Sequence, residues 1–295
     1  YAPDKIRALL AAGANPDALE VTHGLVREPM LVRVIKRRNP DIDAALVRDF
    51  LEAGADPDIR GGHKQVTPLI AAASYGLADV CQVLLDAGAD PDHVSEDIYN
   101  TTPLHVALID RPAHLEAARV LLKAGADPNK IVRGETAACV AVENGTVEGL
   151  ALLAEFGAEF GARPDHSAKD LLRDSPLALA MRTHGRIACA RWLPEESAVD
   201  VNEVDGSGNS ALSMALRSES EEMLALAVEA GADLDLLVGR DESRQTALCL
   251  YLSWSRASFE MIAGLLEHGA DANIADSSGR TPLWWAVNHA RPKVV

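Results

Sequence analysis

Aromatic side chains are scarce in this sequence, since Phe, Trp and Tyr together make up 4% of its 295 residues. This scarcity favours slim helices that pack through Ala and Leu. Long hydrophobic runs are also absent: no stretch of 18 or more apolar residues occurs, so no segment is expected to span a membrane. The sequence shows no signal-peptide pattern. No Ser/Gly linker or low-complexity tract interrupts the chain, which indicates one continuous array.

Cysteines are few and widely spaced: Cys81, Cys139, Cys189 and Cys249 form no Cys-x-x-Cys pair. Each takes the place of a small buried residue. A disulfide framework is therefore not expected, and a reducing compartment such as the cytoplasm is. Neither Cys nor His clusters at the spacing of metal ligands, so we expect no metal and no other cofactor.

Basic residues are outnumbered, because 28 Lys and Arg stand against 44 Asp and Glu, for a formal net charge of −16. Nucleic acids and anionic membranes bind through clustered Lys and Arg, so neither is an expected partner. Two explanations of the acidity stay open. It favours a protein partner with a basic surface, or it simply keeps the chain in solution.

The stretch 67–92 contains the unit from which the chain is built. Thr67 is a suitable N-cap and Pro68 a suitable first helical residue, and a slim Ala-rich helix follows them. Gly76 ends this helix, since glycine adopts the left-handed conformation without steric penalty. A second helix is expected over 77–87, with an apolar stripe at helical spacing. The stripe consists of Leu77, Val80, Cys81, Leu84 and Leu85.

One such helix pair cannot bury its own stripe, and the chain supplies copies of it. The ending Leu-Leu-x-x-Gly-Ala-Asp/Asn recurs with glycines mostly 32 to 41 residues apart. One gap of 74 residues is about twice 37, so a further repeat is predicted inside it, opened by Ser175-Pro176-Leu177 and with Gly185 at its turn. The glycines that define the period are Gly13, Gly54, Gly88, Gly125, Gly157, Gly231 and Gly269.

The openings of the first helices repeat too, most completely as Thr-Pro-Leu at Thr67, Thr102 and Thr281. A period in the thirties with this opening resembles the ankyrin repeat, a turn plus two antiparallel helices. The resemblance covers essentially the whole chain. Its most specific matches are 67–92, 102–129 and 269–287.

The resemblance implies an all-α ankyrin-repeat solenoid of about nine units, in which first helices line a concave groove and β-hairpin-like fingers project from one end. Gly208 and Gly279 are expected at the tight turns of two fingers. We expect a single array over 1–295 with a cut unit at each end, as in a trimmed domain of a longer protein. The expected units are 1–17 (partial), 18–58, 59–92, 93–129, 130–163, 164–202, 203–235, 236–273 and 274–295 (partial).

The candidate catalytic groups have structural explanations. His105 follows Thr102-Pro103-Leu104, and in the ankyrin family this histidine hydrogen-bonds the opening threonine and a neighbouring loop. Ile70 and Cys139 stand at the same place in other repeats, a variety that packing tolerates. The acidic finger at 90–97 lacks the ligand alternation of a calcium loop. No phosphate loop or Ser/His/Asp signature occurs, so we expect no enzymatic activity and no small-molecule substrate.

The expected binding residues lie at the ends of the first helices and at the fingertips. Tyr75 and Trp254 stand out, because exposed Trp, Tyr and Arg dominate interface energies; alternatively, both pack beneath an enlarged finger. The other expected residues at helix ends are Ser74, Glu143, Asn144, Arg217, Asn288 and His289. The expected fingertip residues are Arg60, His63, Lys64, His93, Asp97, Tyr99, Arg133, Arg240, Arg244 and Arg280.

Together these patterns predict a non-catalytic module that binds a protein partner through the concave groove and the fingers. Two alternatives stay open: the array is the targeting domain of a larger enzyme or effector, or it is an acidic inhibitor or immunity protein that covers a basic toxin. A flanking domain with its own motifs would favour the first. Loss of affinity with rising salt would favour the second.

Overall fold

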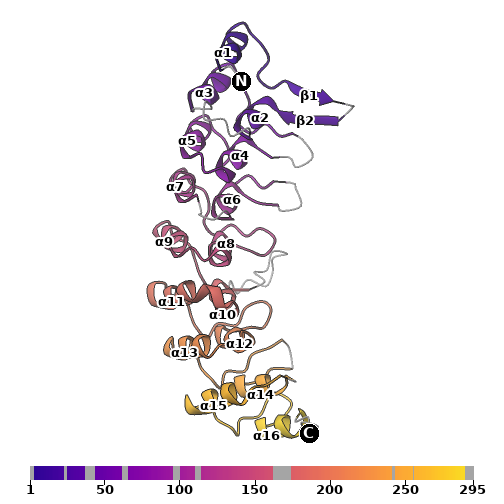
Figure 1. Cartoon of the computed structure of the whole chain (residues 1–295), viewed down its shortest axis with the longest axis vertical. Helices are drawn as coiled ribbons and strands as arrows, with labels where there is room; N and C mark the ends of the chain where they lie inside the picture. Colours follow the sequence, from indigo (N-terminus) through magenta and orange to yellow (C-terminus); the bar gives the residue numbers. More distant parts are fainter. Residues whose placement is uncertain are drawn as a thin grey trace. The chain divides into compact units, whose positions relative to one another are not determined.

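The computed structural model describes residues 3–22, 25–36, 44–61, 66–95, 100–109, 114–161, 174–240, 243–254 and 256–289. The chain forms two compact units, Tyr1–Asn144 with Ala151–Ala158, and Gly145–Leu150 with Glu159–Val295. Each unit is built from helices that stack in two rows (Figure 1). Within the described ranges, no helix combines the length and apolar character that crossing a membrane requires.

In the first unit, consecutive helices alternate between the two rows, and each helix packs on the next member of its own row. The row of first helices comprises α2 (Met30–Lys36), α4 (Pro68–Ser74), α6 (Pro103–Ile109) and α8 (Ala137–Asn144). The row of second helices comprises α1 (Pro3–Ala11), α3 (Ala44–Glu52), α5 (Ala78–Asp86) and α7 (Leu115–Lys123). Helix α9 (Val147–Glu155) is divided between the units.

The second unit repeats this arrangement. Its first helices are α10 (Pro176–Arg182), α12 (Ala211–Arg217), α14 (Ala247–Leu252) and α16 (Pro282–His289). Its second helices are α11 (Ile187–Glu196), α13 (Glu221–Glu229) and α15 (Phe259–Glu267). The repeat predicted inside the long glycine gap is therefore present as α10 and α11. Gly185 lies at the turn between these helices, as predicted, in a short 3-10 helix, η1 (His184–Arg186).

The fingers carry the little β-structure that the described residues contain. Strands β1 (Leu19–Thr22) and β2 (Leu25–Pro29) pair antiparallel, with Val21 opposite Val26. This first finger is thus a true β-hairpin. Three later fingers are closed by single antiparallel bridges, at Gly61–Val66, Val132–Glu135 and Val238–Gln245. In Figure 1 the β1–β2 hairpin projects from the row of first helices, on the side away from the second helices.

The stretch 67–92 folds as its sequence indicates. The Thr67 hydroxyl accepts a hydrogen bond from the Ile70 amide at 3.3 Å, and Pro68 begins helix α4. Gly76 ends the hairpin turn in the left-handed conformation, with φ of +66°. Six residues of α4, from Pro68 to Ala73, are buried, because thin Ala-rich helices sit between neighbours on both sides.

The apolar stripe of α5 is buried less evenly than the sequence suggests. Val80, Cys81 and Leu84 belong to the core, whereas Leu77 and Leu85 are only half-buried. Leu84 faces the neighbouring helices, and Leu85 lies one position round the helix toward solvent. Consecutive leucines in the repeat ending therefore differ in what they contribute to stability.

This difference predicts unequal costs of truncation. Leu84→Ala should lower the free energy of unfolding by about 2–5 kcal/mol, because it removes a fully buried side chain and leaves a cavity. Leu85→Ala is the matched control and should cost clearly less. Urea denaturation of both variants measures this, and equal losses would contradict the assignment.

Carboxylates and amides at the base of the fingers connect consecutive repeats. The Asp58 carboxylate accepts from the Asp90 amide at 3.1 Å, and the Asp92 carboxylate accepts from the Asp127 amide at 3.0 Å. The equivalent Asn202 accepts from the Asp233 amide at 2.7 Å. The acidic residues at these places are therefore structural acceptors. Other members of this ladder are Asp17, Asn129 and Asp235.

The asparagines of the ladder predict how the aspartates respond to substitution. Asn202 both accepts from the next repeat and donates to the Gly231 carbonyl at 3.2 Å. Asp58→Asn should therefore change stability by less than about 0.5 kcal/mol, while Asp58→Ala should cost about 1 kcal/mol for the lost hydrogen bond. Chemical denaturation of the two variants checks this. If the alanine variant is as stable as the asparagine variant, the hydrogen bond that Asp58 accepts does not stabilise the fold.

Candidate partner-binding surface

His105, a buried histidine of the first unit, has a structural role, as predicted. The Nδ1 atom of His105 lies 2.7 Å from the Thr102 hydroxyl, and its Nε2 atom lies 3.4 Å from the Glu135 carbonyl oxygen of the next finger. Burial lowers the pKa of His105 to about 4, and the charge of Lys130 adds to this. The ring is therefore neutral near pH 7 and joins two repeats.

The cysteines are equally unsuited to catalysis. All four are free and buried. Burial raises the pKa of Cys81 to about 12 and that of Cys139 to about 11, so neither thiol is a ready nucleophile. In the part of the chain that the structure describes, no group of three or more His, Cys, Asp or Glu side chains could hold a metal ion.

The lowered pKa of His105 predicts a pH dependence of stability. In the unfolded chain the His105 ring takes up a proton below its ordinary pKa of 6.5, whereas in the folded chain the ring stays neutral down to about pH 4. The free energy of unfolding should therefore fall as the pH drops from about 6.5 to about 4. His105→Gln removes this titration. The wild-type chain should lose more stability than the variant over that window in urea titrations, and parallel losses would show that His105 does not contribute.

The ends of two neighbouring first helices in the second unit bring predicted residues together. Trp254 follows the end of α14, and its ring packs edge-on against Tyr251 with ring centroids 5.3 Å apart. The guanidinium of Arg217, at the end of α12, lies 5.5 Å from the centre of the Trp254 ring. Trp254 is half-buried and Arg217 is exposed. The pair thus presents an aromatic ring and a charge on adjacent helix ends.

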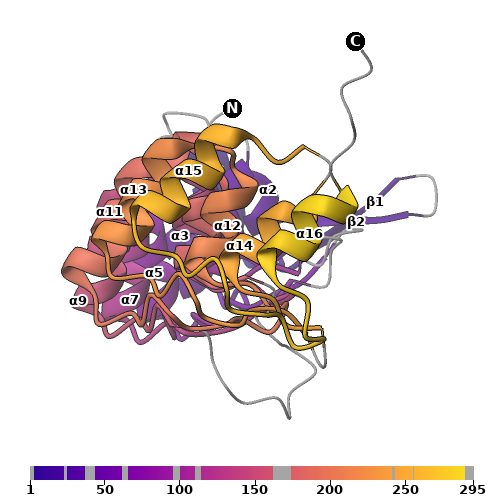
Figure 2. The same ribbon diagram turned by 90° about the horizontal axis from the view of Figure 1, so that it is seen from below.

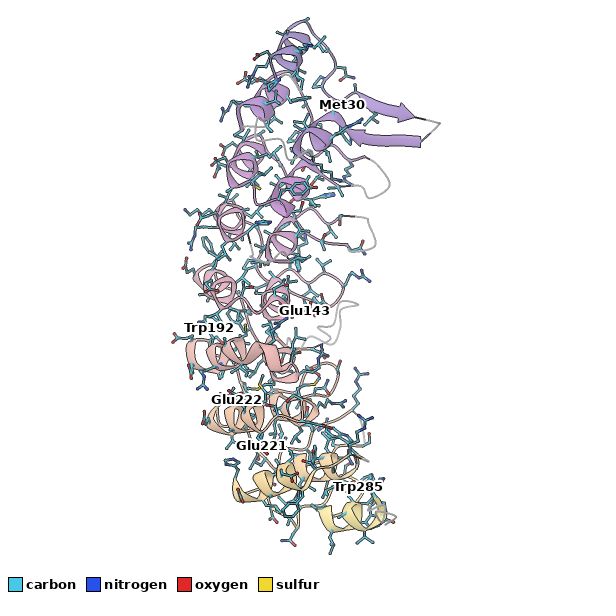
Figure 3. All side chains as sticks on the ribbon, viewed as in Figure 1. Met30, Glu143, Trp192, Glu221, Glu222 and Trp285 are labelled. Atoms are coloured by element: carbon cyan, nitrogen blue, oxygen red, sulfur yellow. The ribbon has the colours of Figure 1, made fainter. Side chains whose placement is uncertain are left out.

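The predicted residues at the ends of the first helices in the first unit do not form such a pair. Tyr75 is the C-cap residue of α4 and is half-buried, and the Ser74 hydroxyl donates to the Ala71 carbonyl at 2.8 Å. Glu143 is exposed on α8 (Figure 3). Asn144 is engaged, because its Nδ2 donates to the Leu108 carbonyl of the neighbouring first helix at 2.6 Å.

Helix α16 holds two predicted residues, and both are exposed. The Nδ2 of Asn288 donates to the Trp284 carbonyl at 2.8 Å, and the His289 ring lies 4.9 Å from the Trp285 ring between centroids. Trp285 is itself buried, with its Nε1 donating to the Asp276 carboxylate at 3.0 Å. Asn288 and His289 thus contact their own helix while they stay exposed.

The predicted fingertip residues divide by exposure. Arg60, Arg133, Arg240 and Arg244 are exposed, whereas His93 is buried. The four residues His63, Lys64, Asp97 and Tyr99 lie outside the described residues. Of the exposed fingertip arginines, Arg60 and Arg133 lie in the first unit, and Arg240 and Arg244 lie in the second.

Arg280 differs from the other arginines because its own finger holds it. Its Nε donates to Oδ2 of Asp276 at 2.9 Å, and its guanidinium lies 4.3 Å from the centre of the Trp285 ring. Burial alone would raise the pKa of Asp276, but this hydrogen bond and those from the Arg280 amide and Trp285 lower it. In the equivalent finger, among the described residues, Oδ2 of Asp205 has no hydrogen-bond partner, and burial raises its pKa.

Two apolar surfaces were not among the predicted sites. A pocket of about 330 Å³ lies between α1, α2 and α3. At the other end of the helical order, Phe259 of α15 and Leu283 and Val287 of α16 are 78%, 71% and 69% exposed. One sequence signal lies near the pocket, because residues 1–10 resemble a second helix. The residues that line the pocket include Ile6, Leu9, Leu10, Met30, Val34 and Phe50.

Comparisons with known proteins agree with this architecture. The family model described as ankyrin repeats (3 copies) matches residues 31–132, and the model described as ankyrin repeats (many copies) matches residues 177–228. The ankyrin repeat domain of human ASB11 superposes with a TM-score of 0.60 at 20% identity, over 83% of this chain and 99% of that domain. The likeness to ASB11 concerns the fold alone.

Several larger proteins contain similar stretches. Inversin from Canis lupus familiaris is 30% identical over 206 residues, 68% of this chain and 14% of Inversin. The B-cell lymphoma 3 protein homolog of Mus musculus is 27% identical over 60% of this chain and 37% of that protein. Palmitoyltransferase Hip14 of Drosophila melanogaster is 38% identical over 32% of this chain and 14% of Hip14. This chain spans well under half the length of each of these relatives. The family models and the stacked hairpins together show that the chain belongs to the ankyrin repeat family.

Proposed function

We propose that this chain is a non-catalytic module that binds a protein partner through the ends of its first helices and through its fingers. Ankyrin repeats generally serve as protein–protein interaction modules. The observation that carries the finer proposal is the contact of Arg217 with Trp254 across two adjacent helix ends. Arg and Trp are the residue types that most often dominate binding energy.

The physical basis of binding is a surface that is ordered before the partner arrives. The helix ends are held by capping bonds, such as the Thr246 hydroxyl accepting from the Cys249 amide at 3.3 Å at the start of α14. The Ser253 hydroxyl after the helix donates to the Leu250 carbonyl at 2.7 Å. Little conformational entropy is then lost when a partner contacts Trp254, so more of the contact energy contributes to affinity.

The charge of the chain specifies the partner further. A formal net charge of −16 favours a partner with a basic surface, which the field of the chain would attract. The buried free cysteines suit a reducing compartment such as the cytoplasm. The similarity to part of Palmitoyltransferase Hip14 supports a second candidate, in which the array directs a larger enzyme to its target.

The helix-end surface can be tested with matched tryptophan substitutions. Immobilised chain captures partners from source lysate, and the most enriched protein is then titrated calorimetrically against each variant. Trp254→Ala should weaken binding by about 2 kcal/mol, and adding Tyr75→Ala should weaken it further. Both residues are only half-buried, so the fold should survive.

Trp192→Ala is the control. Trp192 is also half-buried and also packs edge-on against an aromatic ring, that of Phe160 at 5.6 Å, but it lies on the second helix α11 (Figure 3). The Trp192→Ala substitution should leave the affinity for the partner unchanged. If Trp192→Ala weakens binding while Trp254→Ala does not, the partner uses the second helices and this footprint is wrong. Affinity that falls with rising salt would support a basic partner.

A further inference from the structure

Two fingers of the second unit are built around the same tight turn, each with an aspartate at its start. The amide of Asp205 donates to the Asn209 carbonyl at 2.8 Å, and the amide of Asp276 donates to the Arg280 carbonyl at 2.9 Å. Oδ1 of each aspartate also accepts two backbone amides of its own turn, at 2.8 to 2.9 Å. We call residues 205–209 the Asp205 turn. The backbone thus satisfies one carboxylate oxygen of each aspartate in the same way.

The second carboxylate oxygen distinguishes the two fingers. Oδ2 of Asp276 accepts from Nε of Arg280 at 2.9 Å and from Nε1 of Trp285 at 3.0 Å. In the other finger, an asparagine whose Nδ2 lies 3.5 Å from Oδ1 takes the place of Arg280. Met214, which has no donor, takes the place of Trp285. Oδ2 of Asp205 is therefore buried without a hydrogen-bond partner, in a residue that is 5% exposed.

The charged groups around Asp205 do not offset this burial. Burial raises the pKa of Asp205, and the negative charge of Asp174 adds to the rise, against the backbone hydrogen bonds that lower it. Asp174 precedes α10 and is bonded by Arg182 of that helix at 2.9 Å. Glu203 lies on the same finger as Asp205, and Arg240 lies on the next one. None of them donates to Oδ2, so the ionised carboxyl is disfavoured.

The Asp205 turn supports the finger that follows it, residues 236–245, which we call the Arg240 finger. Gly208 has φ of +82°, and a Cβ atom built on it would lie 2.8 Å from the carbonyl carbon of Gly239 and 3.0 Å from Cγ of Arg240. The helices that the two fingers precede, α12 and α14, pack on each other (Figure 2). The order of the Asp205 turn therefore affects the finger that carries the exposed Arg240.

Such a turn does not require a charge at its start. In the first unit the corresponding residue is Ser95, which is 1% exposed and whose amide donates to the Thr101 carbonyl at 2.9 Å. The neutral Ser95 hydroxyl accepts from the Thr101 amide at 2.9 Å. A neutral carboxyl at Asp205 also satisfies the turn, because its carbonyl oxygen still accepts the two amides.

We propose that Asp205 makes the fingers of the second unit sensitive to pH: in mild acid its buried carboxylate takes up a proton, which stabilises the Asp205 turn and the Arg240 finger packed on it. The proton binds Oδ2, the oxygen that has no donor, while Oδ1 keeps its two amides. A buried negative charge is thereby removed without the loss of a hydrogen bond.

The raised pKa fixes the direction of the response. The folded Asp205 carboxyl binds a proton more tightly than the unfolded one, whose ordinary pKa is 3.8. Its contribution to the free energy of unfolding is therefore complete below pH 3.8 and is lost as the pH rises through the folded pKa. Asp276 has the opposite sign. Its pKa is lowered, so its contribution is present above pH 3.8 and is lost as the pH falls through its folded pKa.

Carbon-13 NMR of the chain labelled at its aspartate carboxyl carbons measures both groups directly. Asp205→Asn and Asp276→Asn each remove one resonance and so assign it. The midpoint of the Asp205 titration should lie above pH 3.8 and that of Asp276 below it. Asn209→Arg supplies the donor that Arg280 supplies to Asp276, and should shift the Asp205 midpoint downward. An Asp205 midpoint at or below pH 3.8 in the wild-type chain overturns the proposal.

Hydrogen exchange, corrected for the intrinsic exchange rates, tests the effect on the fingers. From about pH 7 to about pH 4, protection in peptides covering 203–210 and 236–240 should rise in the wild type more than in Asp205→Asn. Asp276→Asn is the matched control and should keep the wild-type response of these peptides. Equal responses of the wild type and Asp205→Asn would show that another group is responsible. If Asp205→Asn does not fold, Asn209→Arg replaces it and should reduce the same response.

Discussion

The burial of each hairpin against the next is the interaction on which the rest of this molecule depends. A two-helix unit with an apolar stripe on one side has no interior of its own. Leu84 of α5 and the alanines of α4 are buried only because other repeats lie against them. Stability therefore arises at the contacts between repeats, as expected for a solenoid. Scarce aromatic residues follow from the same constraint, since slim helices must approach closely.

Polar groups reinforce this dependence at the contacts between repeats. His105 connects the start of its own helix to the next finger. Ladder residues such as Asp58 accept a hydrogen bond from a backbone amide of the following repeat. Some of the acidic residues, such as Asp58 and Asp92, thus have a structural use at the finger bases. The proposed binding residues, above all Arg217 and Trp254, stand at positions where repeats differ.

The repeat pattern allowed most of the fold to be predicted from the sequence, because capping residues and glycines act locally. Thr67 caps its helix and Gly208 and Gly279 take left-handed turns, as expected. Long polar side chains were less predictable. His93 is buried, and Arg280 folds back onto Asp276. Their placement depends on side-chain contacts that the repeat pattern does not specify, such as that of Arg280 with Asp276 of its own finger. The nine-unit division and the binding residues remain predictions.

Hydrogen exchange measured by mass spectrometry tests the neighbour dependence most directly. Leu121→Ala opens a cavity at a fully buried position of α7. If stability lies between repeats, protection should fall most in α6 and α7, less in the adjoining α4 and α5, and hardly at all in α12 to α16. An equal loss of protection throughout the chain would contradict this, because it would show one cooperative core in place of stacked hairpins.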